Sequence, residues 1–362
     1  MTGMMKAVRF FEYGGPDVLK YKDFPQPEVG PQDVKVRVLA TTISGYDLKF
    51  RAGHMAGFRL PGRKALSLPM QLGRDIAGVV EEIGSEVRTF RVGDRVVGLT
   101  SPANPMSPMT MMGLGNLSTD IDIPGHTMFG SNAQFVSRPE SYFLPLPENV
   151  SMVDAAAAIW AYGTSHRALV DRLRARLGET ILIVGASGGM GSATLDLAVG
   201  MGLRTIVTTR SAAKGEFLRQ RGAAEVAVLN ETDNAAETIR QLGGGNMGLD
   251  LAIDFSGDPK MQRLCIDVLR PGGRMAIGAG EDPREMAPAK VSDFIRLELS
   301  ISGVRGSNIS DQLAVVKLLA QGKIKPAVAK VMNLSEIVKA HEMLASNAVN
   351  GRIVLEPWAA GE

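Results

Sequence analysis

The chain has little of the chemistry that would bind metals or form cross-links. Its 362 residues include one cysteine, Cys265. A single cysteine excludes an intrachain disulfide bond, and it excludes a structural zinc site built from several thiolates. The four histidines are scattered along the sequence, and we interpret them as surface or core imidazoles; they are His54, His126, His166 and His341. The sequence therefore predicts no metal site.

An excess of either charge is also absent, as are long apolar runs. Lysine and arginine total 40 against 38 acidic residues, a net charge of +2, which excludes strong charge-driven binding to nucleic acid or to anionic membranes. No apolar run approaches the ~18–20 residues that span a bilayer, and residues 1–9 lack the apolar segment of a secretory signal. We therefore expect a cytoplasmic protein that binds neither nucleic acid nor membrane.

What is present indicates two domains, since ~100–200 residues per domain is typical. The first 150 residues predict short strands at 35–39, 76–83 and 94–99, separated by glycine and proline turns. Residues 101–130 predict a long irregular loop rich in Met, Pro, Gly and Ser. Its methionines suit either an adaptable apolar lid or a disordered exposed loop; they are Met106, Met109, Met111 and Met112.

From residue 180 onward, apolar strand-like runs alternate with helical stretches such as 192–201 and 214–220. The runs are 181–184, 205–208, 225–229, 249–254, 274–278 and 299–303. Repeated β-α units predict a parallel, doubly wound sheet. Helices at 312–320 and 335–345 and a strand at 352–355 follow, and we expect them to return to the first domain.

The most specific local signal is a glycine-rich turn that follows an apolar strand and opens a helix, at residues 184–191. Glycines permit a tight turn and a close approach of backbone N–H groups to a pyrophosphate, and the helix N-terminus favours its charge. The residues expected to bind the cofactor here are Gly185, Ser187, Gly188, Gly189, Met190 and Gly191. A purely structural turn is the alternative.

The next predicted strand ends in residues that favour NADPH over NADH. NAD-selective sites place a carboxylate there to bind the ribose 2′-hydroxyl. This chain instead has Thr209, Arg210 and Lys214, and two cations favour a 2′-phosphate. The alternative is that the two basic residues form a solvated helix start.

Several further motifs occur in a fixed order along almost the whole chain. They are Gly14–Leu19, Gly73–Val80, Val92–Val96, Tyr162–Ser165, Leu269–Arg274, Gly322–Pro326 and Gly351–Leu355. With these motifs the chain resembles the medium-chain dehydrogenases/reductases, and in particular the quinone oxidoreductase and enoyl reductase-like branch. The resemblance implies an α/β protein with a GroES-like β-barrel catalytic domain (1–155 and 306–362) and a Rossmann domain (156–305). It also implies an active site in the cleft between these domains.

The resemblance further indicates which branch of the family applies. The three ligands of the catalytic zinc in zinc-dependent members correspond to Ser44, Arg74 and Trp160, none of which is a plausible zinc ligand. The chain therefore resembles the zinc-free branch. Arg74 could bind a substrate carboxylate or phosphate, or it could pair with Asp75 or another carboxylate, and we favour the structural pairing.

Hydride transfer to a carbonyl develops negative charge on oxygen, which zinc otherwise stabilises. Without zinc, hydrogen bonds must stabilise that charge, and a conjugated acceptor lessens the demand by delocalising it. We therefore predict an oxidoreductase that transfers hydride from NADPH to a quinone, enone or enoyl thioester. The alternatives are a metal-free alcohol dehydrogenase or carbonyl reductase, and a non-catalytic NADPH-binding protein.

The expected catalytic residues are Tyr46 and Ser44, because the resemblance places a catalytic or proton-relay group in this segment. A phenol could donate a hydrogen bond or a proton; the alternative is that Tyr46 packs in the barrel core. Relatives often have a tyrosine at the position of Met55, and its absence places that donor in doubt. His54 is a neighbouring alternative that we expect to be exposed.

The resemblance also assigns residues outside the glycine turn to the cofactor. Thr164 would contact the nicotinamide or cap a helix, and Arg352 would reach the pyrophosphate or remain a surface charge on an edge strand. Ser256 and Gly278 complete the predicted cofactor site. Family members usually dimerise through edge strands of the Rossmann sheet, which predicts a homodimer formed through residues 299–303. Cys265 is expected to be a buried small apolar residue.

Overall fold

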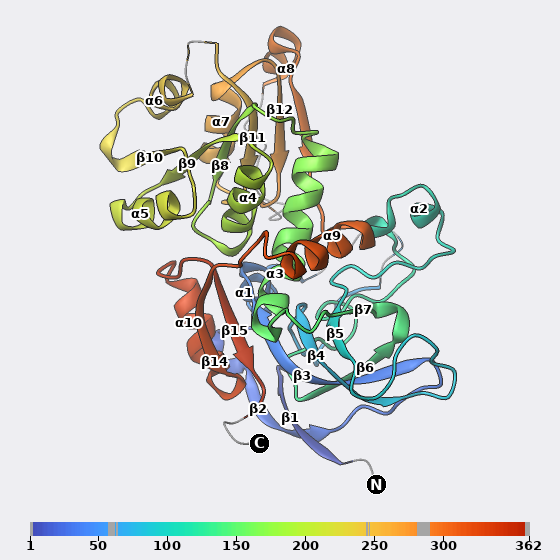
Figure 1. Ribbon diagram of the computed structural model, residues 1–362. Coiled ribbons are helices and arrows are strands. Elements are labelled where there is room, and N and C mark those ends of the chain that lie inside the picture. The colour runs from blue at the N-terminus through green and yellow to red at the C-terminus, as the bar shows by residue number, and fades with distance from the viewer. Residues whose placement is uncertain are drawn as a thin grey trace. The chain divides into compact units, whose positions relative to one another are not determined.

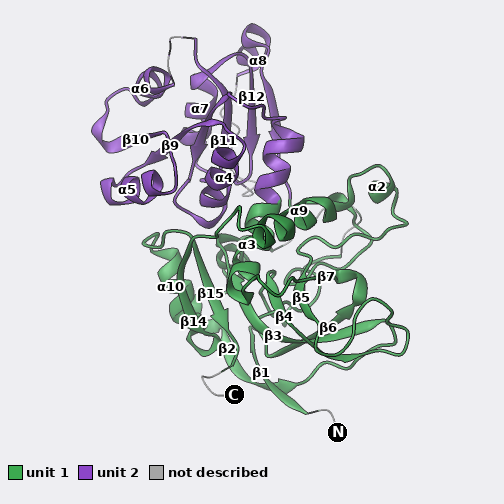
Figure 2. Cartoon of the chain, in the orientation of Figure 1, with its two compact units in different colours: residues 1–163, 306–362 green, residues 164–305 purple. Residues whose placement is uncertain are grey.

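The computed structural model describes residues 3–56, 62, 64–243, 245, 247–280 and 290–358. The chain forms two compact units, residues 1–163 with 306–362 and residues 164–305 (Figure 2). The second unit is thus inserted between two parts of the first. The sequence places the boundary at residue 155, whereas the contacts place it after Gly163, inside a helix.

Unit 2 is built on a parallel sheet (Figure 1). Its strands are β8 (Thr180–Val184), β9 (Arg204–Thr209), β10 (Glu225–Val228), β11 (Leu249–Asp254), β12 (Leu269–Ile277) and β13 (Ser300–Gly303). They lie in the order β10-β9-β8-β11-β12-β13, and each neighbouring pair is parallel. This order reverses between β8 and β11, as in a Rossmann fold. The predicted doubly wound sheet is therefore confirmed.

Helices connect these strands and cover the sheet. They are η4 (Ala168–Arg172), α4 (Gly189–Gly200), α5 (Ala212–Gln220), η5 (Leu229–Glu231), α6 (Ala235–Leu242), α7 (Pro259–Val268) and α8 (Val291–Leu297). Helix α4 packs on β8 and β9, and α7 packs on β11 and β12. The central strand β8 is an almost continuous buried apolar run, as expected of a parallel strand with both faces covered. Cys265 is fully buried on α7, as predicted, and burial raises the pKa of its thiol.

Unit 1 contains a larger sheet that is mostly antiparallel. Its strands are β3 (Asp33–Ile43), β4 (Ile76–Ile83), β5 (Arg95–Gly98), β6 (Phe135–Pro139), β7 (Phe143–Pro145), β14 (Val328–Asn333) and β15 (Arg352–Glu356). The order is β14-β15-β3-β4-β5-β7, and β6 pairs with β3. Alternate residues Val34, Val36 and Val38 of β3 are fully buried in one apolar cluster. This alternation is the period of a strand with one buried face.

The other elements of unit 1 surround this sheet. They are β1 (Met4–Arg9), η1 (Pro16–Val18), β2 (Lys20–Pro25), α1 (Gly45–Arg51), α2 (Pro108–Met111), η2 (Gly115–Leu117), η3 (Glu140–Tyr142), α3 (Met152–Arg167), α9 (Ile309–Ala320), η6 (Leu334–Glu336) and α10 (Ile337–Ala345). Helix α3 continues from unit 1 into the first residues of unit 2. No helix in the described ranges is both long enough and apolar enough to cross a membrane.

Residues 101–130 are not wholly irregular, because they form α2 and η2. The side chain of Asn308 bonds the backbone of this segment at Gly113 and Asn116, with N···O distances of 3.0 and 3.1 Å. Met106 and Met111 are 73% and 64% exposed. The segment is thus anchored at its backbone while it presents methionines to solvent.

Candidate active site and cofactor site

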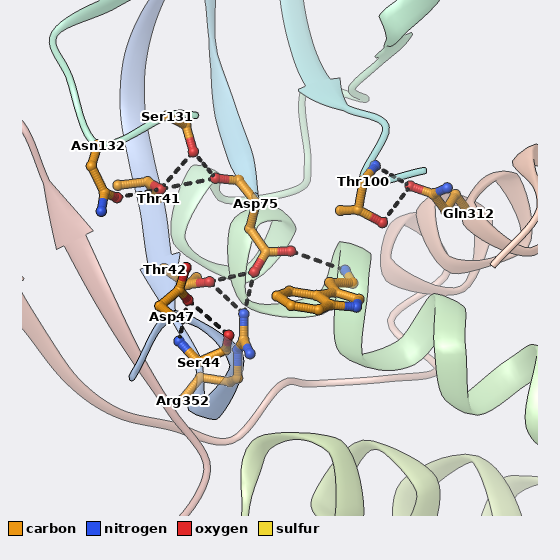
Figure 3. Close-up of polar contacts among 11 residues, drawn as sticks. Thr41, Thr42, Ser44, Asp47, Asp75, Thr100, Ser131, Asn132, Gln312 and Arg352 are labelled. Atoms are coloured by element: carbon orange, nitrogen blue, oxygen red, sulfur yellow. Dashed lines mark hydrogen bonds and ion pairs between the residues drawn. The ribbon is translucent and has the colours of Figure 1, made fainter. Parts of the chain in front are cut away.

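A buried carboxylate, Asp75, organises one end of β4 in unit 1 (Figure 3). Its Oδ2 accepts hydrogen bonds from the Thr42 hydroxyl on β3 and from Nη2 of Arg352 on β15. Its Oδ1 accepts the backbone N–H of Trp160 on α3 at 3.1 Å. The preferred pairing of Arg74 with Asp75 is therefore wrong, because Arg352 occupies that carboxylate.

The main chain at Asp75 is held as firmly as its side chain. The hydroxyls of Thr41 and Ser131 both donate to the Asp75 carbonyl oxygen, at 2.9 and 2.6 Å, and lie 2.8 Å from each other (Figure 3). Gly73, two residues earlier, has a φ of +95° that an L side chain rarely adopts. This local geometry fixes the direction in which Arg74, between them, leaves the backbone.

Arg74 extends to a group of aromatic rings. Its guanidinium carbon lies 4.4 Å from the ring centroid of Trp160 and 5.5 Å from that of Tyr46, within cation-π range. Its Nη2 donates to the carbonyl oxygen of Thr100 at 3.0 Å. The backbone N–H of Thr100 in turn donates to Oε1 of Gln312 on α9, at 2.9 Å (Figure 3). Arg74 and Trp160, two of the three positions that the resemblance aligns with zinc ligands, thus form a cation-π pair.

Tyr46, the predicted donor, lies on α1 beside this pair. Its ring centroid is 6.1 Å from that of Trp160, 5.9 Å from that of His126 and 6.2 Å from that of Phe50. The ring also packs on the apolar cluster that contains Met55, which is only 3% exposed. Tyr46 is half-buried, so packing on the core and presenting a phenol beside Arg74 are compatible roles.

Ser44 lies at the start of α1 and bonds within its own turn. Its backbone N–H and its hydroxyl both donate to Oδ2 of Asp47 at 2.7 Å (Figure 3). Asp47 is 1% exposed, and burial raises the pKa of this carboxyl despite the two hydrogen bonds from Ser44. Sequence analysis did not identify Asp47, although a serine followed three residues later by an acid is a helix-start signal.

In unit 2, the glycine-rich turn joins β8 to α4 as predicted. Gly185 has a φ of +80°, a conformation that favours glycine. A Cβ on Gly191 would lie 2.2 Å from the Gly185 carbonyl oxygen, so a larger residue has no room there. Gly188 precedes the first turn of α4, and a Cβ there would lie 3.5 Å from that oxygen, which is an ordinary van der Waals contact. The structure thus presents a backbone cradle at a helix N-terminus, which suits a pyrophosphate.

The other predicted cofactor residues of unit 2 gather at the same edge of the sheet. The backbone N–H and hydroxyl of Ser256 donate to Oδ1 of Asp254, at 2.8 and 2.6 Å, and the Gly278 N–H donates to the Asp254 carbonyl oxygen at 2.9 Å. A Cβ on Gly185 would lie 3.3 Å from the Ser256 nitrogen. Asp254, which the sequence did not reveal as important, therefore holds together the ends of β11 and β12.

The end of β9 carries positive charge. Arg210 is exposed, and Lys214 follows on α5. The pKa of Lys214 is lowered by partial burial and by the nearby Arg210 charge, which places the two cations in one neighbourhood. The Thr209 hydroxyl accepts the Ser211 N–H at 3.1 Å. No acidic residue lies between Thr209 and Gly215 in the sequence, so a ribose 2′-hydroxyl would meet no carboxylate from this turn.

Two sequence interpretations need correction. Thr164 lies near the C-terminal end of α3, so it does not cap a helix N-terminus; its hydroxyl is buried without a hydrogen-bond partner among the described residues. Arg352 is 5% exposed and lies on β15, between β14 and β3. The alternative of a surface charge on an edge strand is therefore wrong. The contact of Arg352 with the cofactor pyrophosphate stays a prediction, because its described contacts are with Asp75 and Thr42.

The residues present do not fit a zinc ion. In the described ranges, no group of three or more His, Cys, Asp or Glu side chains is arranged to hold a metal. His54 is exposed as expected, whereas His126 and His341 are buried. Ser44 is bonded to Asp47, while Arg74 and Trp160 offer a cation and an indole, which are not metal donors.

Comparison with known proteins agrees with this architecture. Residues 30–148 match the alcohol dehydrogenase GroES-like domain family, and residues 189–321 match the zinc-binding dehydrogenase family. A mouse (Mus musculus) quinone oxidoreductase is 29% identical over 360 residues, covering 97% of this chain and 98% of its own. An NAD-dependent alcohol dehydrogenase from Sulfurisphaera tokodaii is 28% identical over 355 residues, covering 98% and 100%.

Two solved structures are also similar over the whole chain. The crystal structure of AibC is 30% identical, with a TM-score of 0.87, and covers 99% of this chain and 97% of its own. That of an NAD-dependent alcohol dehydrogenase is 30% identical, with a TM-score of 0.89, and covers 98% and 100%. With its GroES-like domain, its Rossmann unit and these relatives, the chain belongs to the medium-chain dehydrogenase/reductase superfamily, a superfamily of oxidoreductases that use nicotinamide cofactors.

Proposed function

We propose that the protein is an NADPH-dependent reductase that transfers hydride to a conjugated acceptor, a quinone, enone or enoyl thioester, without zinc. The observation that carries this proposal is the substitution at the three metal-ligand positions. Ser44, Arg74 and Trp160 cannot hold a zinc ion, while in unit 2 a glycine-rich turn at Gly185 leads into a helix N-terminus, a geometry that suits a dinucleotide. The related quinone oxidoreductases support the same class of acceptor.

The chain's own residues account for cofactor binding. Backbone N–H groups at the start of α4 would bind the pyrophosphate, with Gly188 leaving room for its approach. Arg210 and Lys214 would pair with a 2′-phosphate, which selects NADPH over NADH. The buried Thr164 hydroxyl, which has no described partner, is the group available to the nicotinamide amide. When bound, the reduced nicotinamide supplies the hydride.

The acceptor must then carry negative charge that no metal neutralises. In a conjugated acceptor, hydride adds to the β-carbon and the charge spreads over an enolate or a hydroquinone. A hydrogen-bond donor beside the oxygen contributes roughly 3–4 kcal/mol in other enzymes. Tyr46 is the donor that we assign, because its phenol belongs to the ring group around Arg74. The Ser44 hydroxyl is already bonded to Asp47, so we assign it a positioning role.

The proposal is tested by NADPH oxidation with matched acceptors. Cyclohexenone and cyclohexanone differ only in conjugation, and we expect faster turnover of the enone by the purified protein. Tyr46→Phe should lower kcat with little change in NADPH affinity. Faster turnover of the ketone would instead support a metal-free carbonyl reductase, the second candidate. The related alcohol dehydrogenases favour that candidate.

Two glycine variants separate a cofactor site from a merely structural turn. Gly188→Ala adds a methyl group that makes only an ordinary van der Waals contact, so the fold should persist while NADPH affinity falls at least about tenfold. Gly191→Ala forces a methyl group against the Gly185 carbonyl oxygen, so it should lower the melting temperature. Unchanged NADPH affinity in Gly188→Ala would count against the site, and so would failure of the protein to oxidise NADPH with any enone or quinone.

Cofactor preference is tested by titration. NADPH should bind more tightly than NADH, and Arg210→Ala should shrink the difference by about tenfold, since an Arg–phosphate pair is charge-assisted. Equal affinities of the parent for both cofactors would overturn the preference for NADPH.

We also propose a homodimer formed through β13, which lies at an edge of the unit 2 sheet. A mass of one chain by light scattering would contradict this proposal.

A further inference from the structure

Arg74 is a cation that has no carboxylate counter-ion in the part of the chain that the structure describes. Among the described residues no carboxylate lies within ion-pair distance of it, because Asp75 is paired with Arg352. Within the described part of the chain, its one hydrogen bond joins Nη2 to the Thr100 carbonyl oxygen at 3.0 Å. Its Nε is fully buried and has no hydrogen-bond partner among the same residues. A guanidinium has five N–H donors, so Arg74 retains donor capacity beyond this hydrogen bond.

The surroundings hold this cation in place. The Trp160 ring lies 4.4 Å from the guanidinium carbon, and the Trp160 backbone is bonded to Asp75 at 3.1 Å. On the other side, Thr100 is held by Gln312 at 2.9 Å. Segments that are far apart in the sequence thus converge on one side chain. Such a donor needs little reorganisation when negative charge develops beside it.

The same surroundings strengthen its effect on a ligand. Its neighbours on two sides are aromatic rings, those of Trp160 and Tyr46. These rings exclude water and lower the local dielectric constant, which strengthens the interaction of a charge with a nearby oxygen.

We propose that Arg74 is an electrophilic catalyst: it donates a hydrogen bond to the carbonyl oxygen of the acceptor and so polarises that carbonyl group. This inference rests on the proposed function. In the step, hydride from reduced nicotinamide forms a C–H bond at the β-carbon, and the C=C electron pair moves to the oxygen as an enolate. The nicotinamide is oxidised and the acceptor is reduced. The Arg74 cation, together with the Tyr46 phenol, stabilises the enolate oxygen until a proton from solvent completes the reduction at the α-carbon.

An equilibrium probe tests this role without turnover. Para-nitrophenol mimics the acceptor oxygen in neutral and anionic forms, and its absorbance reports which form is bound. We expect the protein to favour the phenolate, which lowers the pKa of bound nitrophenol by about one unit or more, and Arg74→Met to abolish that preference. Arg91→Met, which removes an exposed arginine of the same unit, is the matched control. An identical phenolate preference in the parent and Arg74→Met would overturn the inference.

Kinetics provide the second test. Arg74→Met should lower kcat/KM for cyclohexenone by roughly 100-fold, the usual effect of losing one oxyanion donor, while NADPH affinity stays within about twofold. Arg74→Lys should recover part of the loss, and added ethylguanidinium should partly rescue Arg74→Ala. The melting temperature of each variant shows whether it is folded. A folded Arg74→Met enzyme with the parent kcat/KM would overturn the inference while the proposed function stands. A parent enzyme that is inactive with every conjugated acceptor would overturn the proposed function itself.

Discussion

Two buried arginines in unit 1 differ in how the fold accommodates a buried positive charge. Arg352 on β15 is 5% exposed and is neutralised by Asp75. Arg138 on β6 is 1% exposed, and its Nε, Nη1 and Nη2 have no hydrogen-bond partner among the residues that the structure describes. Arg138 lies two residues after Val136 on the same face of β6, and Val136 belongs to the apolar cluster of the sheet. One guanidinium therefore has a site prepared for its charge, and the other does not.

The two arginines therefore differ in the polar groups that surround them. Burial lowers the pKa of Arg138 to about 10, with only a small opposing effect from Tyr142. Around Arg352, by contrast, Asp75 and Thr42 both accept its Nη2. In unit 1 the ion pair of Arg352 and Asp75 thus lies next to the segment that carries Arg74. Arg138, in contrast, places a charge in the apolar interior of the sheet, which selection for stability alone would not favour.

The largest effect on stability should come from removing the ion pair between Arg352 and Asp75. Arg352→Met leaves the Asp75 carboxylate buried and uncompensated, which should lower the free energy of unfolding by about 3–5 kcal/mol. Urea denaturation measures this change. The control is Lys339→Met, which removes an exposed ion pair with Glu336 and should change stability by less than about 1 kcal/mol. Equal effects of the two substitutions would show that Asp75–Arg352 is energetically no different from a surface pair.

A somewhat smaller effect, of opposite sign, should come from Arg138→Met. Lowering the pKa of Arg138 to about 10 from 12.5 corresponds to about 3 kcal/mol of penalty on the charged form, at roughly 1.4 kcal/mol per unit. Replacement by an apolar chain of similar length should therefore raise the free energy of unfolding by up to about that amount. Arg138→Gln, which keeps a polar group without partners, should gain less. A clear loss of stability in Arg138→Met would show that the guanidinium is satisfied after all.

His341 sharpens the comparison, since it is a basic group that is buried without its charge. Burial and the nearby Arg51 lower its pKa to about 3 from 6.5. As pH falls below 6.5, the unfolded chain binds a proton that the folded protein does not. Stability present above pH 6.5 is therefore lost toward lower pH, by about 2 kcal/mol at pH 5.

Denaturation of the parent and of His341→Gln at pH 7 and pH 5 measures this contribution. The variant should lose less stability than the parent between these two pH values, because it has no imidazole at this position to titrate. Between pH 7 and pH 8 the two proteins should behave alike. A parent protein whose stability is the same at pH 5 and pH 7 would contradict the shift.

Sequence patterns located the elements well where local chemistry decides structure. Strands β4 and β11 have the predicted bounds, 76–83 and 249–254, because each is an apolar run ended by turn residues. The glycine turn at Gly185 could also be predicted from the sequence, since a positive φ favours glycine. The ion pair of Asp75 could not be predicted, because Arg352 is remote along the chain whereas Arg74 is adjacent to Asp75.

The sequence by itself determined the class of the protein. Strand and helix periods and the glycine turn, which depend on residues close in the chain, indicated the Rossmann unit. The ordered motifs implied the GroES-like unit through the family resemblance that they carry. Only the tertiary structure decided which charges are matched. It joined Arg352 to Asp75, left Arg138 without a hydrogen-bond partner in the described ranges and packed Arg74 against Trp160. Ion pairs form between side chains that folding brings together, and their stability depends on burial.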